Sequence, residues 1–122
     1  EGEMMLDREE VFNYVNRKYD VKPDYPWKTY SNFAALRHKA NKKWFALVMN
    51  IAQDKLGLNG SDEIDVLNLK IRQEFIGPLR KKEGFYKAYH MDKSNWISIN
   101  LNEINSINHI KDLIAESYEL TN

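Results

Sequence analysis

Three histidines are the side chains best suited to metal binding or acid–base chemistry, and they lie far apart in the sequence. His38, His90 and His109 fall in three separate segments without the spacing of a zinc site. The sequence contains no cysteine, which excludes disulfides, thiol nucleophiles and thiolate metal ligands. We therefore expect no metal site.

Other arrangements that could support catalysis are incomplete. Ser94 lies four residues after His90, but neither a nucleophile turn nor an orienting carboxylate accompanies the pair. The five glycines are isolated, so no glycine-rich phosphate loop is present. Asp62, Glu63 and Asp65 lack the pattern of a calcium loop and are typical of a solvated strand end. The sequence thus predicts a protein without a cofactor that is not an enzyme.

Basic and aromatic side chains gather in two stretches of a chain whose 18 Lys and Arg balance 18 Asp and Glu. Residues 37–55 hold five basic residues against one acidic residue, and residues 80–93 hold five against two. Cations neutralise phosphates and rings stack on bases, so this mixture suits nucleic acid. Alternatively, the charges are only solvated turns and the rings are core. The candidate nucleic-acid contacts are Arg37, Lys39, Lys42, Lys43, Lys87, His90, Lys93 and Trp96.

The first half of the chain should position the first basic stretch at the tip of a hairpin. Asp7 and Glu10 form a capping-box pattern that predicts a helix over residues 8–18, and two prolines predict an extended connector over 21–27. Apolar segments at 33–36 and 44–49 flank the charged tip at 37–43. Residues 55–61 predict a second hairpin connection before a strand over 64–70, and their Asn59-Gly60 pair is typical of tight hairpin turns.

The second half should place the second basic stretch between a helix and the last strands. An apolar stripe predicts a helix over 71–79, kinked or split at Gly77-Pro78, and then a short strand or extended loop over 85–89. Alternation over 96–101 puts Ile97, Ile99 and Leu101 on one strand face. A last helix should follow, with Asn102 or Asn105 as its cap and an apolar stripe formed by Ile107, Ile110, Ile114 and Tyr118.

This element order predicts a two-layer α/β (α+β) fold. A mainly antiparallel sheet should carry helices on one face, in the order α-β-β-β-α-β-β-α. The length of 122 residues fits one domain over residues 1–122, with residues 1–6 expected to be flexible. No apolar run approaches the ~18 residues that span a bilayer, and the first residues do not form a signal peptide. We expect a soluble cytoplasmic protein with no membrane partner.

The order of several short motifs resembles the MmcQ/YjbR family from about Arg8 to Leu120. These motifs are Tyr25-Pro26-Trp27, Lys43-Trp44-Phe45-Ala46, Leu67-Asn68-Leu69-Lys70, the stretch from His90 to Ile97, and Ser117-Tyr118. The resemblance implies a fold similar to CyaY-like and secretion-chaperone-like proteins. It also implies a DNA-binding role through a "double wing" of two hairpins. Where many members have a glycine-containing turn in the first hairpin, this chain has Lys39-Ala40-Asn41-Lys42.

Three functions remain open from the sequence. The first is weak, salt-dependent binding of DNA, in which seven cations on the two wings give a log–log salt slope of at most about −6. The second is a protein-interaction or chaperone-like module that docks through Tyr25, Trp27 and Tyr30. The third is a small-molecule pocket near His90 and Trp96. For His90 itself, phosphate binding competes with a structural role, in which its side chain bonds the backbone of the turn before Trp96.

Overall fold

The computed structural model describes residues 5–122 and confirms the predicted order of elements. The helices are α1 (Arg8–Tyr19), α2 (Gln73–Arg80) and α3 (Lys111–Leu120), and the strands are β1 (Ala34–Arg37), β2 (Trp44–Ala52), β3 (Glu63–Lys70), β4 (Phe85–Lys87) and β5 (Trp96–Asn100). Short 3-10 turns are η1 (Gln53–Leu56), η2 (Leu101–Glu103) and η3 (Ile107–His109). No helix in this part of the chain has the length and apolar composition that a membrane crossing requires.

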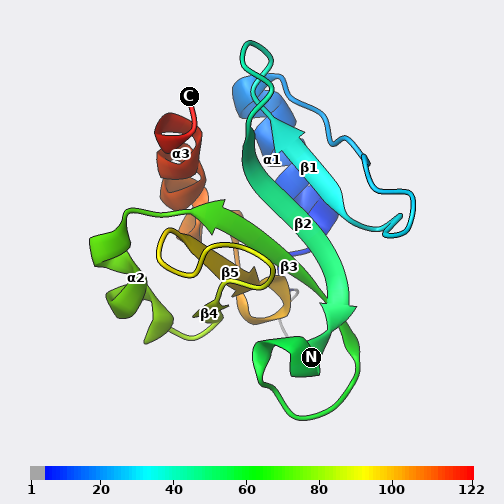
Figure 1. Cartoon of the computed structure of the whole chain (residues 1–122), viewed down its shortest axis with the longest axis vertical. Coiled ribbons are helices and arrows are strands. Elements are labelled where there is room, and N and C mark those ends of the chain that lie inside the picture. Colours follow the sequence, from blue (N-terminus) through cyan, green and yellow to red (C-terminus); the bar gives the residue numbers. More distant parts are fainter. Residues whose placement is uncertain (1–4) are drawn as a thin grey trace.

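The five strands form one antiparallel sheet in the order β1-β2-β3-β5-β4. Figure 1 shows α1 and α3 behind this sheet, so the helices cover one face as the sequence predicted. On the opposite face, the loop between β4 and β5 lies in front of the strands. The fold is therefore a two-layer α+β structure whose second face is covered by loops rather than helices.

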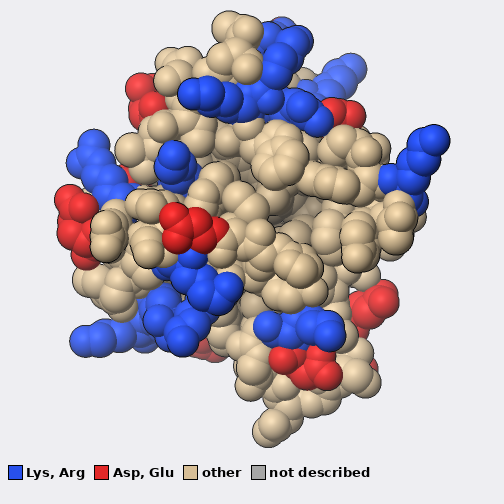
Figure 2. All heavy atoms as spheres, viewed as in Figure 1, with Lys and Arg blue, Asp and Glu red and all other residues tan. Residues whose placement is uncertain are grey.

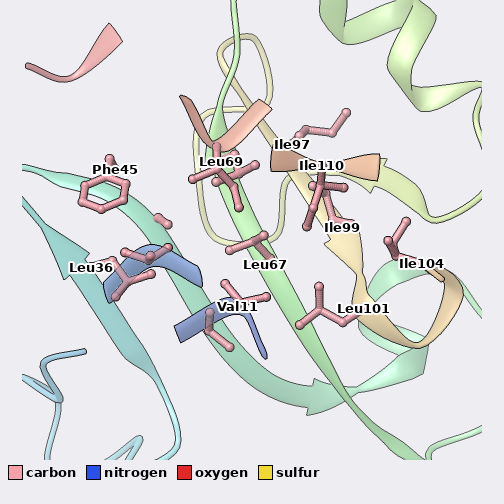
Figure 3. Packing of buried hydrophobic residues seen from close by; sticks show 14 of the residues in the cluster. Val11, Leu36, Phe45, Leu67, Leu69, Ile97, Ile99, Leu101, Ile104 and Ile110 are labelled. Atoms are coloured by element: carbon pink, nitrogen blue, oxygen red, sulfur yellow. The ribbon is translucent and has the colours of Figure 1, made fainter. Parts of the chain in front are cut away.

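The helix-covered face holds the main hydrophobic core (Figure 3). One row of side chains crosses all five strands in register: Ala34, Val48, Leu67, Ile99 and Phe85. Every member of the row is buried. Residues two apart along a strand share a face, so this register explains why the apolar alternation of the sequence selects this packing against α1 and α3.

The next row of the sheet, on the loop-covered face, differs in having polar residues at its centre. It runs through Ala35, Leu47, Asn68, Ser98 and Tyr86. Asn68 and Ser98 are fully buried because residues of the β4–β5 loop cover them. A smaller apolar cluster extends this face and comprises Met49, Ile51, Ile64 and Val66 with Phe33, Leu56, Leu58 and Tyr89.

The N-terminal helix begins as predicted. The Asp7 carboxylate accepts a hydrogen bond from the Glu10 N–H at 2.9 Å, and the Glu10 carboxylate accepts one from the Asp7 N–H at 3.3 Å. Within the segment expected to be flexible, residues 1–4 lie outside the described residues, whereas Leu6 is buried and donates its N–H to the Ile104 carbonyl at 2.8 Å. Leu6 is therefore held against the core before α1 begins, and the prediction of flexibility is wrong for this residue.

Three local predictions differ from the structure. The predicted hairpin connection between β2 and β3 forms, but it is a longer loop that contains η1, and Asn59-Gly60 does not make a tight turn because only Gly60 of the pair has a positive φ, at 97°. Pro78 lies within one continuous helix, α2, only two residues before its end. Ser106, not Asn102 or Asn105, caps the turn η3, and α3 then begins without a side-chain cap.

The core row makes Ile99 a sharp test of the fold. Ile99 is fully buried on β5, an interior strand between β3 and β4, so Ile99→Ala should lower the free energy of unfolding by about 2–5 kcal/mol. Phe75→Ala is the control because Phe75 is 44% exposed, and its effect should stay within about 1 kcal/mol. Urea unfolding measures both variants. Equal, small losses would contradict the interior position of β5.

Candidate nucleic-acid interface

The strand order brings both predicted wings to the same end of the sheet. β2 begins at Trp44, β3 ends at Lys70, and β5 begins at Trp96. Because neighbouring strands are antiparallel, these three positions lie at the same end of the sheet, and Lys70 pairs directly with Trp96. The turn at 38–43 and the loop at 88–95 therefore both leave the sheet at this end.

A shallow groove of about 360 Å³ lies at this end of the sheet. Three lysines and two tryptophans line it: Lys42, Lys43, Lys70, Trp44 and Trp96. Leu120, the last residue of α3, and Thr121 after it complete the lining, and no Asp or Glu among the described residues belongs to it. In Figure 2, Lys and Arg side chains gather along the upper part of the molecule, where Figure 1 places the β1–β2 turn. We call this site the basic groove.

The lysines of the groove are free of acidic partners at ion-pair distance within residues 5–122. Asp92 is an acidic group close enough to Lys70 to interact with its charge. Its pKa lies below the ordinary value, first because it accepts the Ser94 N–H, then because it accepts the Asn95 side-chain amide, and also because Lys70 is nearby. These hydrogen bonds, of 2.9 and 3.0 Å, hold the Asp92 carboxylate on its own turn.

Arg37 and Lys39, the other basic residues of the first wing, are paired instead. Arg37 Nε lies 3.0 Å from Asp24 Oδ2, and Lys39 Nζ lies 2.5 Å from Asp20 Oδ2. The hydrogen bond from Lys39, and then its charge, lower the pKa of Asp20. The structure therefore separates the first wing into two paired cations and two unpaired cations, Lys42 and Lys43.

The turn that carries Lys42 forms without a glycine. Lys42 has φ of 65°, a left-handed conformation that glycine adopts most easily. Its N–H donates to the His38 carbonyl at 3.0 Å, and the His38 N–H donates to the Lys43 carbonyl at 2.9 Å. The Asn41 side chain accepts the Lys43 N–H at 2.8 Å. These bonds fix the turn and hold Lys42 in a backbone conformation that glycine adopts most easily.

The second wing folds back over the sheet, and the buried Asn68 holds it there. The Asn68 amide donates to the Tyr89 carbonyl at 2.9 Å, the Tyr89 N–H donates to the Ser98 hydroxyl at 2.9 Å, and that hydroxyl donates to Asn68 Oδ1 at 2.5 Å. The ring of His90 lies over Tyr89 with a centroid distance of 4.0 Å. The His90 side chain makes no hydrogen bond to the turn before Trp96 among the described residues, so the structural alternative predicted for it does not form.

This fold-back brings His90 and Met91 to an aromatic pocket of about 250 Å³ on the loop-covered face. The remaining lining consists of Trp27, Tyr30, Phe33 and Trp44 over a floor of Leu47 and Met49. Figure 2 shows this side of the molecule hollowed near its centre. Trp44 lines both the aromatic pocket and the basic groove, so the two sites adjoin.

The last two candidate residues, Lys87 and Lys93, are exposed and line neither site. Lys87 pairs with Ile97 at the edge strand β4 and therefore shares the side of the sheet that the helices cover. Of the eight candidates, the structure brings Lys42, Lys43 and Trp96 together in the groove and places His90 in the adjoining pocket.

Sequence reasoning missed Lys70 and assigned Trp27 and Tyr30 to a docking patch. Lys70 could have been found, because a strand predicted over 64–70 must end beside the starts of its antiparallel neighbours. A pocket near His90 was one of the open interpretations, but its lining by Trp27 and Trp44 in place of Trp96 could not have been predicted, because it depends on how residues 27–33 and 88–91 cover the sheet. Within residues 5–122, no three His, Asp or Glu side chains come together as a metal site would require.

A model of the YjbR family matches residues 16–120 of the chain. The chain belongs to the YjbR family. This YjbR-family protein is 50% identical over 117 residues to the uncharacterized protein YyaQ of Bacillus subtilis, and the match covers 96% of this chain and 99% of YyaQ. The resemblance inferred from the sequence motifs is thereby confirmed.

Solved structures share the fold. The crystal structure of a Pseudomonas syringae protein is 44% identical, with a TM-score of 0.92 over 96% of this chain and all of that one. Its solution NMR structure gives a TM-score of 0.85 over 96% of this chain and 94% of that chain. A Deinococcus radiodurans protein that is 16% identical shares the fold alone, with a TM-score of 0.70 over 95% of this chain and 78% of that chain.

In this YjbR-family chain, α3 is hydrogen-bonded to the end of the sheet that forms the groove. The Ser117 hydroxyl donates to the Phe45 carbonyl of β2 at 2.5 Å and accepts the Lys70 N–H of β3 at 2.9 Å. His38 Nε2 lies 2.8 Å from the Thr121 hydroxyl, and that hydroxyl donates to the Ser117 carbonyl at 2.8 Å. Because the Thr121 proton is used in this way, His38 is the donor to Thr121.

The buried position of His38 predicts a pH-dependent stability. Burial, the largest effect, lowers the pKa of His38 below its ordinary value of 6.5. The neutral ring is thus favoured in the folded state, so stability is fully present above about pH 6.5 and decreases as pH falls through the lower folded pKa. His38→Gln should reduce the loss of unfolding free energy between about pH 7.5 and pH 5.5.

His109→Gln is the matched control because His109 is exposed on η3. This variant should keep the pH profile of the parent protein in urea unfolding at both pH values. A His38→Gln profile as steep as that of the parent would show that the buried imidazole is not responsible.

Proposed function

We propose that this protein binds nucleic acid without catalysing a reaction, through phosphate contacts in the basic groove. The observation that carries the proposal is the convergence of Lys42, Lys43 and Lys70 beside Trp44 and Trp96, with no acidic residue from the described part of the chain in the lining. Phosphates attract lysines regardless of base sequence. Binding should therefore be weak, salt-dependent and non-specific.

The other candidate residues act at the margin of this site in the proposal. His90 faces the adjoining pocket, while Lys87 and Lys93 add positive charge on the second wing. Arg37 and Lys39 can exchange Asp24 and Asp20 for phosphate, because ion pairs on the surface are worth only about 0–1 kcal/mol. The neutral net charge of the chain fits a short contact with few phosphates.

Salt dependence gives the test its quantitative form. Three lysines on three phosphates of a single strand give a log–log slope of about −2, and on duplex DNA a slope of about −3. Lys42→Ala/Lys43→Ala leaves one contact, so the slope for a single strand should fall to about −0.7. Fluorescence anisotropy of a labelled oligonucleotide at several salt concentrations measures the slope for the parent protein and for the variant.

The matched control is Lys55→Ala/Lys111→Ala, which removes the same charge elsewhere. Lys55 lies in η1 beyond the opposite end of β2, and Lys111 lies at the start of α3. This variant should keep most of the parent slope. Equal losses for the two double variants would show that only net charge matters, and an absence of binding by the parent protein at low salt would rule out the proposed function.

A protein-interaction surface is a second candidate, favoured by the exposure of two tyrosines in the connector before β1. Tyr25 is 49% exposed and Tyr30 is 52% exposed, and tyrosine is enriched at interface hot spots. If the chain self-associates there, Tyr25→Ser should lower the mass measured by light scattering at high concentration. A constant monomer mass for parent and variant would count against self-association.

A further inference from the structure

We propose that the aromatic pocket receives one unpaired nucleobase whose phosphate lies in the adjoining basic groove. This inference deepens the proposed function and rests on it for the phosphate contacts. It changes the expected ligand from a DNA duplex to a nucleotide unit with a free base, as found in single-stranded nucleic acid or in a mononucleotide.

The geometry of the rings supports a flat ligand. Trp27 and Trp44 meet edge to face with a centroid distance of 5.2 Å and an interplanar angle of 66°. Tyr30 stacks on Phe33 at 4.8 Å and 19°, and the Trp27 and Phe33 rings are 6.4 Å apart at 76°. Tyr30 and Phe33 thus share one orientation, and Trp27 lies at a steep angle to both Phe33 and Trp44, so the pocket has aromatic walls in more than one orientation. A planar heterocycle can stack on one wall while its edge meets the other.

The size of the pocket restricts what can enter. Its volume of about 250 Å³ is below the ~300–1,000 Å³ typical of sites for drug-sized ligands. It therefore suits a single ring system. Leu47 and Met49 at its floor are buried and offer no charge, and His90 at the wall supplies a polar group that can hydrogen-bond a base edge.

The lysines beside the aromatic pocket favour a ligand that has an anionic group next to its flat ring. Trp44 separates the pocket from Lys42, Lys43 and Lys70, and no Asp or Glu among the described residues lines either site. A ligand that spans both sites must have a flat ring at one end and negative charge at the other. A nucleotide has this arrangement, because its base and its phosphate are joined by one sugar.

A duplex cannot use this pocket without losing a base pair. Paired bases are stacked inside the helix, so a protein reaches a whole base only in a single strand or by extruding it at a cost. Single strands should therefore bind more tightly than duplexes of the same length. In salt titrations, the lysine contacts should make the binding of single strands and the binding of duplexes both depend on salt concentration.

The first experiment uses the unaltered protein. We expect an oligothymidine of about 12 nucleotides to bind about 5- to 150-fold more tightly than the same sugar–phosphate backbone without bases, because stacking is then lost. Binding of the oligothymidine should also quench tryptophan fluorescence. Equal affinity for the two strands would overturn the base pocket while leaving phosphate binding, and hence the proposed function, intact.

Two variants of exposed tyrosines test whether the base binds in the aromatic pocket. Tyr30→Leu should weaken oligothymidine binding by at least about fivefold and change duplex binding less than twofold. Tyr25→Leu is the matched control, because Tyr25 is similarly exposed and lies outside the pocket. Thermal melting checks that both variants fold, and the abasic comparison does not depend on them. Equal effects of the two variants on oligothymidine would overturn the assignment.

Titration with thymidine monophosphate distinguishes the two sources of the ligand. Much weaker binding of the mononucleotide than of the oligothymidine supports single-stranded nucleic acid as the ligand. Equally tight binding that Tyr30→Leu weakens supports a free nucleotide in the same pocket. If only the mononucleotide binds, the proposed function fails and the base pocket stands. If neither ligand binds, both are overturned.

Discussion

The buried hydrogen bonds of Asn68 determine how the loop-covered face of this protein is used. Asn68 is fully buried in the central strand β3 and holds Tyr89 together with Ser98. An unpaired amide at this position would cost about 1–3 kcal/mol, so the network strongly favours the folded-back position of residues 88–95. That position brings His90 and Met91 over the sheet. Without it, the aromatic pocket would lack one wall.

The two faces of the sheet are thus covered in different ways. Helices α1 and α3 bury the apolar face, while Ser117 joins α3 to both β2 and β3 beside the groove. Helix packing therefore also sets the spacing between Trp44 and Lys70. The opposite face is covered by loops, which can leave a hollow between them because they do not pack as a continuous layer.

The fold was largely predictable because its determinants are local or periodic. The capping box at Asp7, the alternation around Ile99 and the antiparallel order follow from neighbouring residues. The extent of the β2–β3 loop did not follow, because Gln53 reaches across to the Asn59 carbonyl and supports a longer path than a tight turn. For the site, residue types indicated Lys42, Lys43 and Trp96 as candidates in two separate stretches, and it is the strand order that places them in one groove. Their separation from the paired Arg37 and Lys39 depends on contacts with residues 20–24.

The two wings share an unusual backbone conformation at one residue each. Lys42 and His90 have φ of 65° and 63°, and with Asp20 they are the non-glycine residues at positive φ in the described chain. Such a conformation costs about 1–2 kcal/mol for a residue with a side chain, and it persists only where the surroundings determine it. At Lys42 the bonds between His38 and residues 42–43 do so, and at His90 the network through Tyr89 does so. The backbone at both positions is thereby fixed, and a fixed backbone lowers the ordering cost that the proposed ligand contacts would carry.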